Sequence, residues 1–118
     1  MRIILRGHIP AKKNLLRRSR NGGLFRDKEV SEQIDTLVLQ AKAQWAGKAP
    51  LDKPELTIQF VCIDQRGDLD NKLVTILDVL QQSGIIVNDN LKHLREFHIY
   101  GSTGAEETCA VWTGKQEW

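Results

Sequence analysis

The chain has 118 residues, of which 41% are hydrophobic and 27% charged, and this balance is typical of one globular domain. No apolar run approaches the roughly twenty residues of a membrane span, and the first residues lack the apolar segment of a signal peptide. These features predict a cytoplasmic protein with no membrane partner. Cys62 and Cys109 are far apart and lack Cys-x-x-Cys partners, which disfavours a zinc site and predicts two buried thiols.

The net charge of +2 conceals an uneven distribution along the chain. Nine of the 17 basic residues, but only one of the 15 acidic residues, lie within residues 1–28. Blocks of positive charge bind the phosphate backbone of nucleic acids through the release of counterions. The N-terminal quarter of the chain therefore predicts a nucleic-acid-binding surface.

The basic quarter contains a predicted strand followed by a predicted loop. Residues 2–9 alternate well enough for a strand, which Pro10 ends. Residues 11–26 are polar and contain a turn signal at 21–23, so we expect a surface loop. The loop's cations favour an arm that grips DNA phosphates over a merely solvated loop: Lys12, Lys13, Arg17, Arg18 and Arg20. Phe25 is expected to anchor the far end of this arm, with stacking on an exposed base as the alternative.

A helix and a central strand are predicted next. Residues 27–46 carry one apolar stripe at helical spacing, formed by Val30, Ile34, Leu37, Val38, Ala41 and Trp45. Gly47 and Pro50 are expected to end this helix. Residues 55–63 alternate as expected of a central strand, and residues 64–67 form the loop that follows it.

The most informative stretch runs from Asp68 to Asp89. Leu73, Ile76, Leu77 and Leu80 have helical spacing, which predicts a helix over residues 70–83 with Asp70 as its N-cap and Gly84 just beyond its end. The short apolar segment after Gly84 can return along the helix, so Asp89 can approach Asp68 and Asp70. Two carboxylates about 4 Å apart repel each other by roughly 4 kcal/mol at an effective dielectric constant near 20. Such a cluster needs a proton, a basic side chain or a divalent cation, and oxygen ligands of this kind suit Mg²⁺.

Two strands complete the predicted fold. Residues 92–100 and 107–113 are expected to form an antiparallel hairpin through the turn at 101–105. The predicted order is β-α-β-α-β-β. It indicates an α+β two-layer sandwich, in which a small mixed four-stranded sheet carries two helices on one face.

The acidic stretch resembles the RusA family of Holliday-junction resolvases. The similar residues are Gly67-Asp68-Leu69-Asp70-Asn71, Leu77-Asp78-Val79-Leu80, Gly84-Ile85-Ile86 and Asp89. The resemblance implies a homodimeric endonuclease of phage or prophage type that cuts four-way DNA junctions symmetrically during recombination and repair. It implies Mg²⁺ as the metal, for which Mn²⁺ can substitute, and no small-molecule cofactor. The family's catalytic and metal-binding acids correspond to Asp68, Asp70 and Asp89.

The sequence departs from the family pattern at two positions. Asn88 stands where the family has the first of two acids, and Val74 stands where the family has a lysine. Lys72 lies two residues before Val74, about 200° around the helix, and is a candidate for a phosphate contact. Arg66 is a second candidate of this kind, and Asn71 is expected to support the acidic loop by hydrogen bonds.

Three functions remain open at this point. The first is a Mg²⁺-dependent nuclease that resolves four-way junctions as a homodimer. The second is a protein that binds branched DNA but cuts it weakly or not at all, which Val74 and Asn88 favour. The third is a small adaptor whose acids are solvated and whose basic arm binds RNA or an acidic partner.

Overall fold

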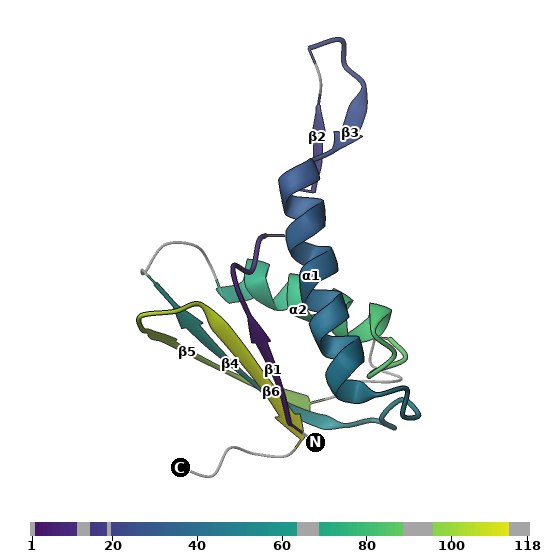
Figure 1. The fold of residues 1–118 in the computed structure, drawn as a ribbon, viewed down its shortest axis with the longest axis vertical. Helices are drawn as coiled ribbons and strands as arrows, with labels where there is room; N and C mark the ends of the chain where they lie inside the picture. The colour runs from purple at the N-terminus through teal and green to yellow at the C-terminus, as the bar shows by residue number, and fades with distance from the viewer. Residues whose placement is uncertain (1, 12–14, 19, 64–68, 89–95, 114–118) are drawn as a thin grey trace.

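The computed structural model describes residues 2–11, 15–18, 20–63, 69–88 and 96–113. Within these ranges the chain forms six strands and two helices, whose arrangement is shown in Figure 1. The elements are β1 (Arg2–Arg6), β2 (Leu16–Arg18), β3 (Leu24–Arg26), α1 (Lys28–Trp45), β4 (Glu55–Cys62), α2 (Leu69–Gln82), β5 (Glu96–Thr103) and β6 (Thr108–Thr113).

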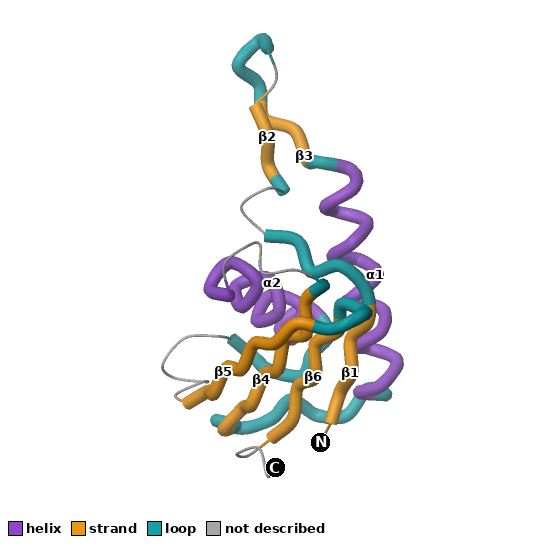
Figure 2. The backbone as a smooth tube through the Cα atoms, turned by 90° about the vertical axis from the view of Figure 1, so that its left-hand side faces the viewer, coloured by secondary structure: helices purple, strands orange, loops and turns teal. Residues whose placement is uncertain are grey.

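Four of the strands form one mixed sheet in the order β1-β6-β4-β5. β6 is antiparallel to both β1 and β4, whereas β4 and β5 are parallel. Figure 2 shows both helices on the same face of this sheet, with the β2–β3 hairpin outside it. The predicted α+β sandwich, with a four-stranded mixed sheet and two helices on one face, is therefore confirmed.

The hydrophobic core lies between the sheet and the helices. Alternate residues of β4, namely Leu56, Ile58 and Phe60, are completely buried, as the period of two requires. The apolar stripe predicted for α1 is confirmed, because each of its six members is buried. α2 contributes Ile76, Leu77, Val79 and Leu80 to the same core.

The ends of the helices follow capping rules. Asp27 precedes α1, and its Oδ1 accepts a hydrogen bond of 3.0 Å from the Val30 N–H, which makes it the N-cap. Ala46 ends α1 with φ at 55°, and Gly47 continues the left-handed conformation with φ at 70°. Gly84 ends α2 in the same way, with φ at 79°, as predicted.

The predicted hairpin of residues 92–100 and 107–113 is wrong. β5 pairs with β4, and β6 lies on the other side of β4, so the connection between them crosses the end of β4. In this crossing the Gly104 N–H donates to the Cys62 carbonyl over 2.9 Å. A Cβ atom on Gly104 would lie 2.7 Å from Cγ1 of Val61, so only glycine fits without a shift. The turn residues indicated a reversal of the chain, but they did not specify which strand would be the neighbour.

Side chains of α1 cover the outer edge of β1. Gln44 Oε1 accepts from the Ile4 N–H over 2.8 Å, and its Nε2 donates to the Ile4 carbonyl over 2.7 Å. Gln40 makes the equivalent pair of bonds with Arg6, each 2.8 Å long. Four residues of helix and two residues of strand both rise about 6–7 Å, so the spacing of the two glutamines matches the spacing of their partners in β1.

Among the described helices, none combines the length and apolar character needed to cross a membrane.

Candidate nucleic-acid and metal site

Asp70 lies in the first turn of α2, beyond the end of β4. The prediction that Asp70 is the N-cap is wrong, because α2 already begins at Leu69 and Asp70 is its second residue. The acid still lies at the positive end of the helix dipole. Its Oδ1 accepts from the N–H of Asn71 over 2.9 Å, and its side chain is exposed. Leu69 covers Gly101 of β5, where an added Cβ would lie 3.0 Å from Leu69 Cδ1. The start of α2 is therefore positioned directly over the sheet, with Asp70 facing outward.

Several predicted site residues fall outside the described ranges. Asp68, Asp89, Arg66, Lys12 and Lys13 are in this group. The convergence of the three aspartates therefore stays a prediction. The half-buried Asn71 is described, and it follows Asp70 in the same helical turn, but its supporting role stays a prediction because residues 64–68 lie outside the described ranges.

Lys72 and Thr75 attach the segment before the basic arm to the first turns of α2. The Lys72 side chain is 8% exposed, and its Nζ donates to the Ile9 carbonyl over 3.1 Å. Thr75 Oγ1 donates to the Pro10 carbonyl over 2.6 Å. The predicted phosphate contact of Lys72 is not what this conformation shows, because the ammonium group bonds the chain's own backbone.

The sequence contained a signal for this burial of Lys72. Lys72 lies four residues before Ile76 and seven before Val79, both of which are fully buried, so it shares their face of the helix. Val74 is instead 53% exposed. Val74 lies one helical turn after Asp70 on the same side of α2, and a longer side chain has room there.

The basic arm lies at the surface and turns between its two strands, as predicted, but it contains a hairpin, so the prediction of a loop throughout residues 11–26 is wrong. β2 and β3 pair antiparallel, with Leu16 opposite Arg26 and Arg18 opposite Leu24. Figure 1 shows this hairpin projecting beyond the sandwich from the N-terminal end of α1. Arg18 and Arg20 are exposed on it, whereas Arg17 is placed only by its backbone, within β2.

The base of the arm is fixed by Asp27 and Leu15. The Asp27 N–H donates to the Leu15 carbonyl over 2.6 Å, while the Asp27 side chain caps α1. Leu15 packs against the hydrophobic core. The anchoring role expected of Phe25 belongs to these two residues, because Phe25 is 48% exposed and stands outside the described core cluster.

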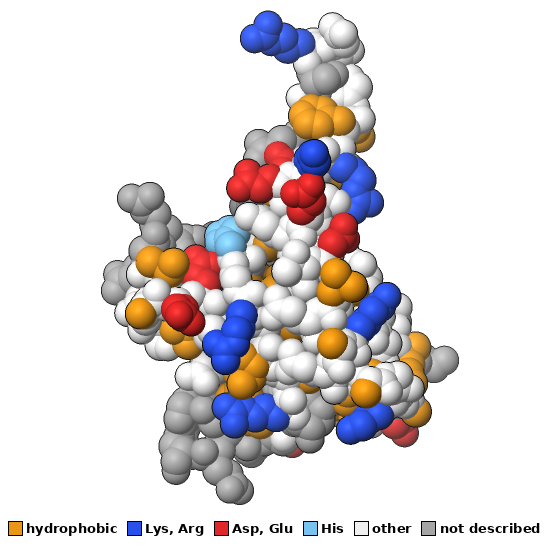
Figure 3. Space-filling model, viewed as in Figure 1, with side chains coloured by type: hydrophobic (Ala, Val, Ile, Leu, Met, Phe, Trp, Pro, Cys, Tyr) orange, Lys and Arg blue, Asp and Glu red, His pale blue; other side chains and the backbone are white. Residues whose placement is uncertain are grey.

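The arm is basic, whereas the first turns of α1, which carry it, are mainly acidic, with Lys28 as the exception. Figure 3 shows basic atoms at the outer end of the arm and acidic atoms on the adjoining turns of α1. The exposed acids of these turns are Glu29, Glu32 and Asp35. A polyanion is therefore attracted to the arm itself and repelled by the first turns of α1.

A second group of side chains could hold a metal ion. Glu55, Glu96 and His98 each offer one ligand atom, and these atoms lie within 4.8 Å of one another. His98 Nε2 lies 3.1 Å from Glu55 Oε1 and 3.3 Å from Glu96 Oε1. The predicted hairpin concealed this group, because it forms only when β4 and β5 run parallel with Glu55 beside Glu96. The group lies at the start of β4, roughly 23 Å of strand away from the end that leads to α2.

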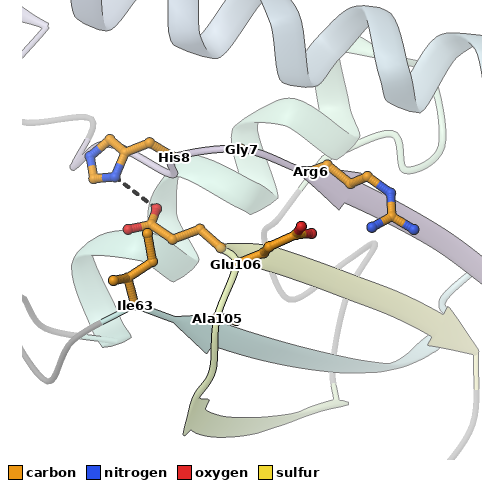
Figure 4. A pocket seen from close by; sticks show the side chains of 7 residues that line it. Arg6, Gly7, His8, Ile63, Ala105 and Glu106 are labelled. Atoms are coloured by element: carbon orange, nitrogen blue, oxygen red, sulfur yellow. Dashed lines mark hydrogen bonds and ion pairs between the residues drawn. The ribbon is translucent and has the colours of Figure 1, made fainter.

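A shallow hollow lies at the end of β4 that leads to the acidic loop. Its volume is about 540 Å³, and it is lined by Arg6, Gly7, His8, Ile63, Ala105, Glu106 and Glu107. His8 Nδ1 lies 2.8 Å from Glu107 Oε2, an interaction that Figure 4 draws as a dashed line from His8. Because two glutamates oppose its arginine and histidine, the hollow is a poor site for phosphate.

The cysteines make no disulfide. Cys109 is buried, as predicted, whereas Cys62 is half-buried, so the prediction holds in full for one thiol only. Burial raises the pKa of the Cys109 thiol far above its ordinary value, and the neighbouring Cys62 raises it further.

The described part of the candidate site consists of Asp70 and Asn71 at the start of α2, with the segment that leads into the arm attached beside them. No model of a known protein family matches the chain, and no curated protein is significantly similar to it.

Proposed function

We propose that the protein is a Mg²⁺-dependent endodeoxyribonuclease that resolves four-way DNA junctions by paired nicks. One observation carries the proposal beyond the sequence motif. The bonds from Lys72 to Ile9 and from Thr75 to Pro10 hold the segment before the basic arm against α2, whose first turn contains Asp70. A phosphate backbone bound by the arm is thereby brought toward the acidic turn.

The donor set of the acidic motif fits Mg²⁺. Asp70 presents an exposed carboxylate at the start of a helix, and carboxylate oxygens are hard ligands. In this proposal Asp68, Asp70 and Asp89 hold the ion, which supplies an activated water and stabilises the charge on the scissile phosphate. Asn71 orients the loop, and the arm positions the strand. A second copy supplies the second nick, since two matched cuts require two sites.

The direct test is a cleavage assay on a synthetic four-way junction with Mg²⁺. We expect the wild type to cut the junction and Asp70→Asn to lose about hundredfold or more in rate. Asp52→Asn is the matched control, because it removes the same charge from an exposed position before β4, at the opposite end of that strand from the motif. Failure of the wild type to cut, or full activity of Asp70→Asn, would refute the nuclease.

The second metal-capable group requires its own control. Glu96→Gln/His98→Ala removes two of its three ligand groups and leaves the acidic motif unchanged. We expect junction cleavage by this variant to equal that of the wild type. Loss of cleavage would place the essential metal at the start of β4 and β5 instead.

A second candidate function follows from Val74, which places an uncharged side chain where the family has a lysine. The protein would then bind junctions tightly and cut them slowly. This alternative predicts salt-dependent junction binding without nicking, and both properties are measured on the same substrate.

A further inference from the structure

We propose that the apolar side chains of the arm contact unstacked bases at the branch point of the junction, with Phe25 as the stacking residue. This inference rests on the proposed function and specifies what the arm recognises. Phosphate contacts alone do not separate a junction from a duplex, because both present the same backbone. Bases become accessible to a protein only where stacking is interrupted, as it can be at a branch point.

The first observation is the exposure of three large apolar side chains on one short hairpin. Leu16 is 57% exposed, Leu24 is 66% exposed and Phe25 is 48% exposed. Within the described part of the chain, the core cluster reaches the arm only through Leu15. These side chains therefore do not stabilise the fold by burial, and their exposure is unfavourable unless something covers them.

The second observation is the alternation of apolar and basic residues on the hairpin. Cross-strand partners share a face, so Leu16, Arg18, Leu24 and Arg26 lie on one face and Phe25 on the other. An arginine thus stands opposite each leucine. Aromatic or apolar groups interleaved with cations are typical of surfaces that bind single-stranded or unpaired nucleic acid, where bases stack and phosphates are neutralised.

Charge decides between DNA and a second copy of the chain as the occupant. The first 26 residues contain no acid, so two arms placed together would repel each other. The described acids nearest to the arm are Asp27 at its base and the exposed acids in the first turns of α1, so a bound polyanion is repelled least toward the tip. Arg20 and Leu24 are exposed toward the tip, whereas Phe25 lies in the middle pair of the hairpin and Leu16 at its base.

The attachment of the arm makes it a positioned probe. Asp27 bonds Leu15 through its backbone and Val30 through its side chain, which joins the base of the hairpin to α1. A hairpin with three residues in each strand is only marginally stable by itself, so its attachment to α1 sets its direction. Phe25, two residues before Asp27, is therefore held close to a fixed point of the fold.

The test compares the dissociation constants for a four-way junction and for a duplex of the same sequence, at one salt concentration, by fluorescence anisotropy. Phe25→Ala is expected to lower the junction preference about tenfold while leaving duplex binding and its salt dependence unchanged. Phe25→Tyr keeps the aromatic face and is expected to retain the preference. Leu39→Ala is the matched control, because Leu39 is 68% exposed on α1 away from the arm. Arg18→Gln is expected to weaken binding to both DNAs equally.

The outcomes separate this inference from the proposed function. If the wild type prefers the junction and Phe25→Ala keeps that preference, the inference is overturned and the proposed function stands. If the wild type shows no junction preference, both are overturned. If sedimentation shows that Phe25→Ala converts a dimer into a monomer, the apolar surface binds a second copy, and the inference is again overturned.

Discussion

Replacement of Gly104 by alanine should destabilise the fold through a single steric contact. Gly104 lies where the connection from β5 to β6 crosses the end of β4, and its N–H donates to the Cys62 carbonyl. The added Cβ would lie 2.7 Å from Cγ1 of Val61. A separation this short forces either the crossing or the valine to move.

The expected cost follows from the partners in this contact. Val61 is β-branched and has few rotamers in a strand, so it cannot turn away freely. Added atoms in packed regions cost about 1–3 kcal/mol, and the partial exposure of Val61 places this case near the lower end. For a chain of this size, a loss of about 1 kcal/mol lowers the Tm by roughly 3–6 °C.

A double-mutant cycle measures this contact. Thermal unfolding is followed for the wild type, Gly104→Ala, Val61→Ala and the double variant. Val61→Ala removes Cγ1, so the double variant should be more stable than the sum of the two single losses predicts. Additive losses would show that the alanine acts on the backbone and not through Val61.

Three further predictions concern other parts of the molecule. Val74→Lys should raise junction cleavage about tenfold, because it places a cation one turn from Asp70, while the uncharged Val74→Met should not. Equal cleavage rates for the two variants would contradict this prediction. Because Val74 is 53% exposed, either substitution should change the free energy of unfolding by less than about 1 kcal/mol. Above pH 9.0, the ordinary pKa of a cysteine, unfolding should release the Cys109 proton that burial retains. The free energy of unfolding of the wild type should therefore fall by about 1.4 kcal/mol per pH unit relative to Cys109→Ala, and parallel pH profiles would exclude this effect. Gln44→Ala should lose about 1–2 kcal/mol in denaturant unfolding, since two hydrogen bonds to Ile4 disappear, whereas Ala43→Ser on the exposed face should change little.

Local sequence patterns predicted the individual helices and strands of this fold better than they predicted which strands lie side by side. The apolar stripe of α1 and the alternation in β4 each depend on nearby residues, and the structure contains both. The pairing of β5 was missed, because alternation shows which residues share a face but not which strand lies beside them. The metal-capable group was missed for the same reason, since it needs Glu55 beside Glu96.

The candidate site shows the same limit. Asp70 was proposed as a site residue because the motif that contains it is short and local, and this role stays a prediction. The burial of Lys72 was not predicted, because its partner is the carbonyl of Ile9, 63 residues earlier in the chain. The hairpin of the arm was also missed, because each of its strands is too short for a periodic signal.

The glutamines that cover β1 also restrict how copies of this protein can associate. Open sheet edges accept strands from other chains, and a sheet with two open edges can grow without limit into fibrils. Here Gln40 and Gln44 occupy one side, and β5 is the last strand on the other. Strand addition can therefore proceed in one direction only. Two copies joined through β5 would leave covered edges at both outer sides, so such growth ends at a closed pair.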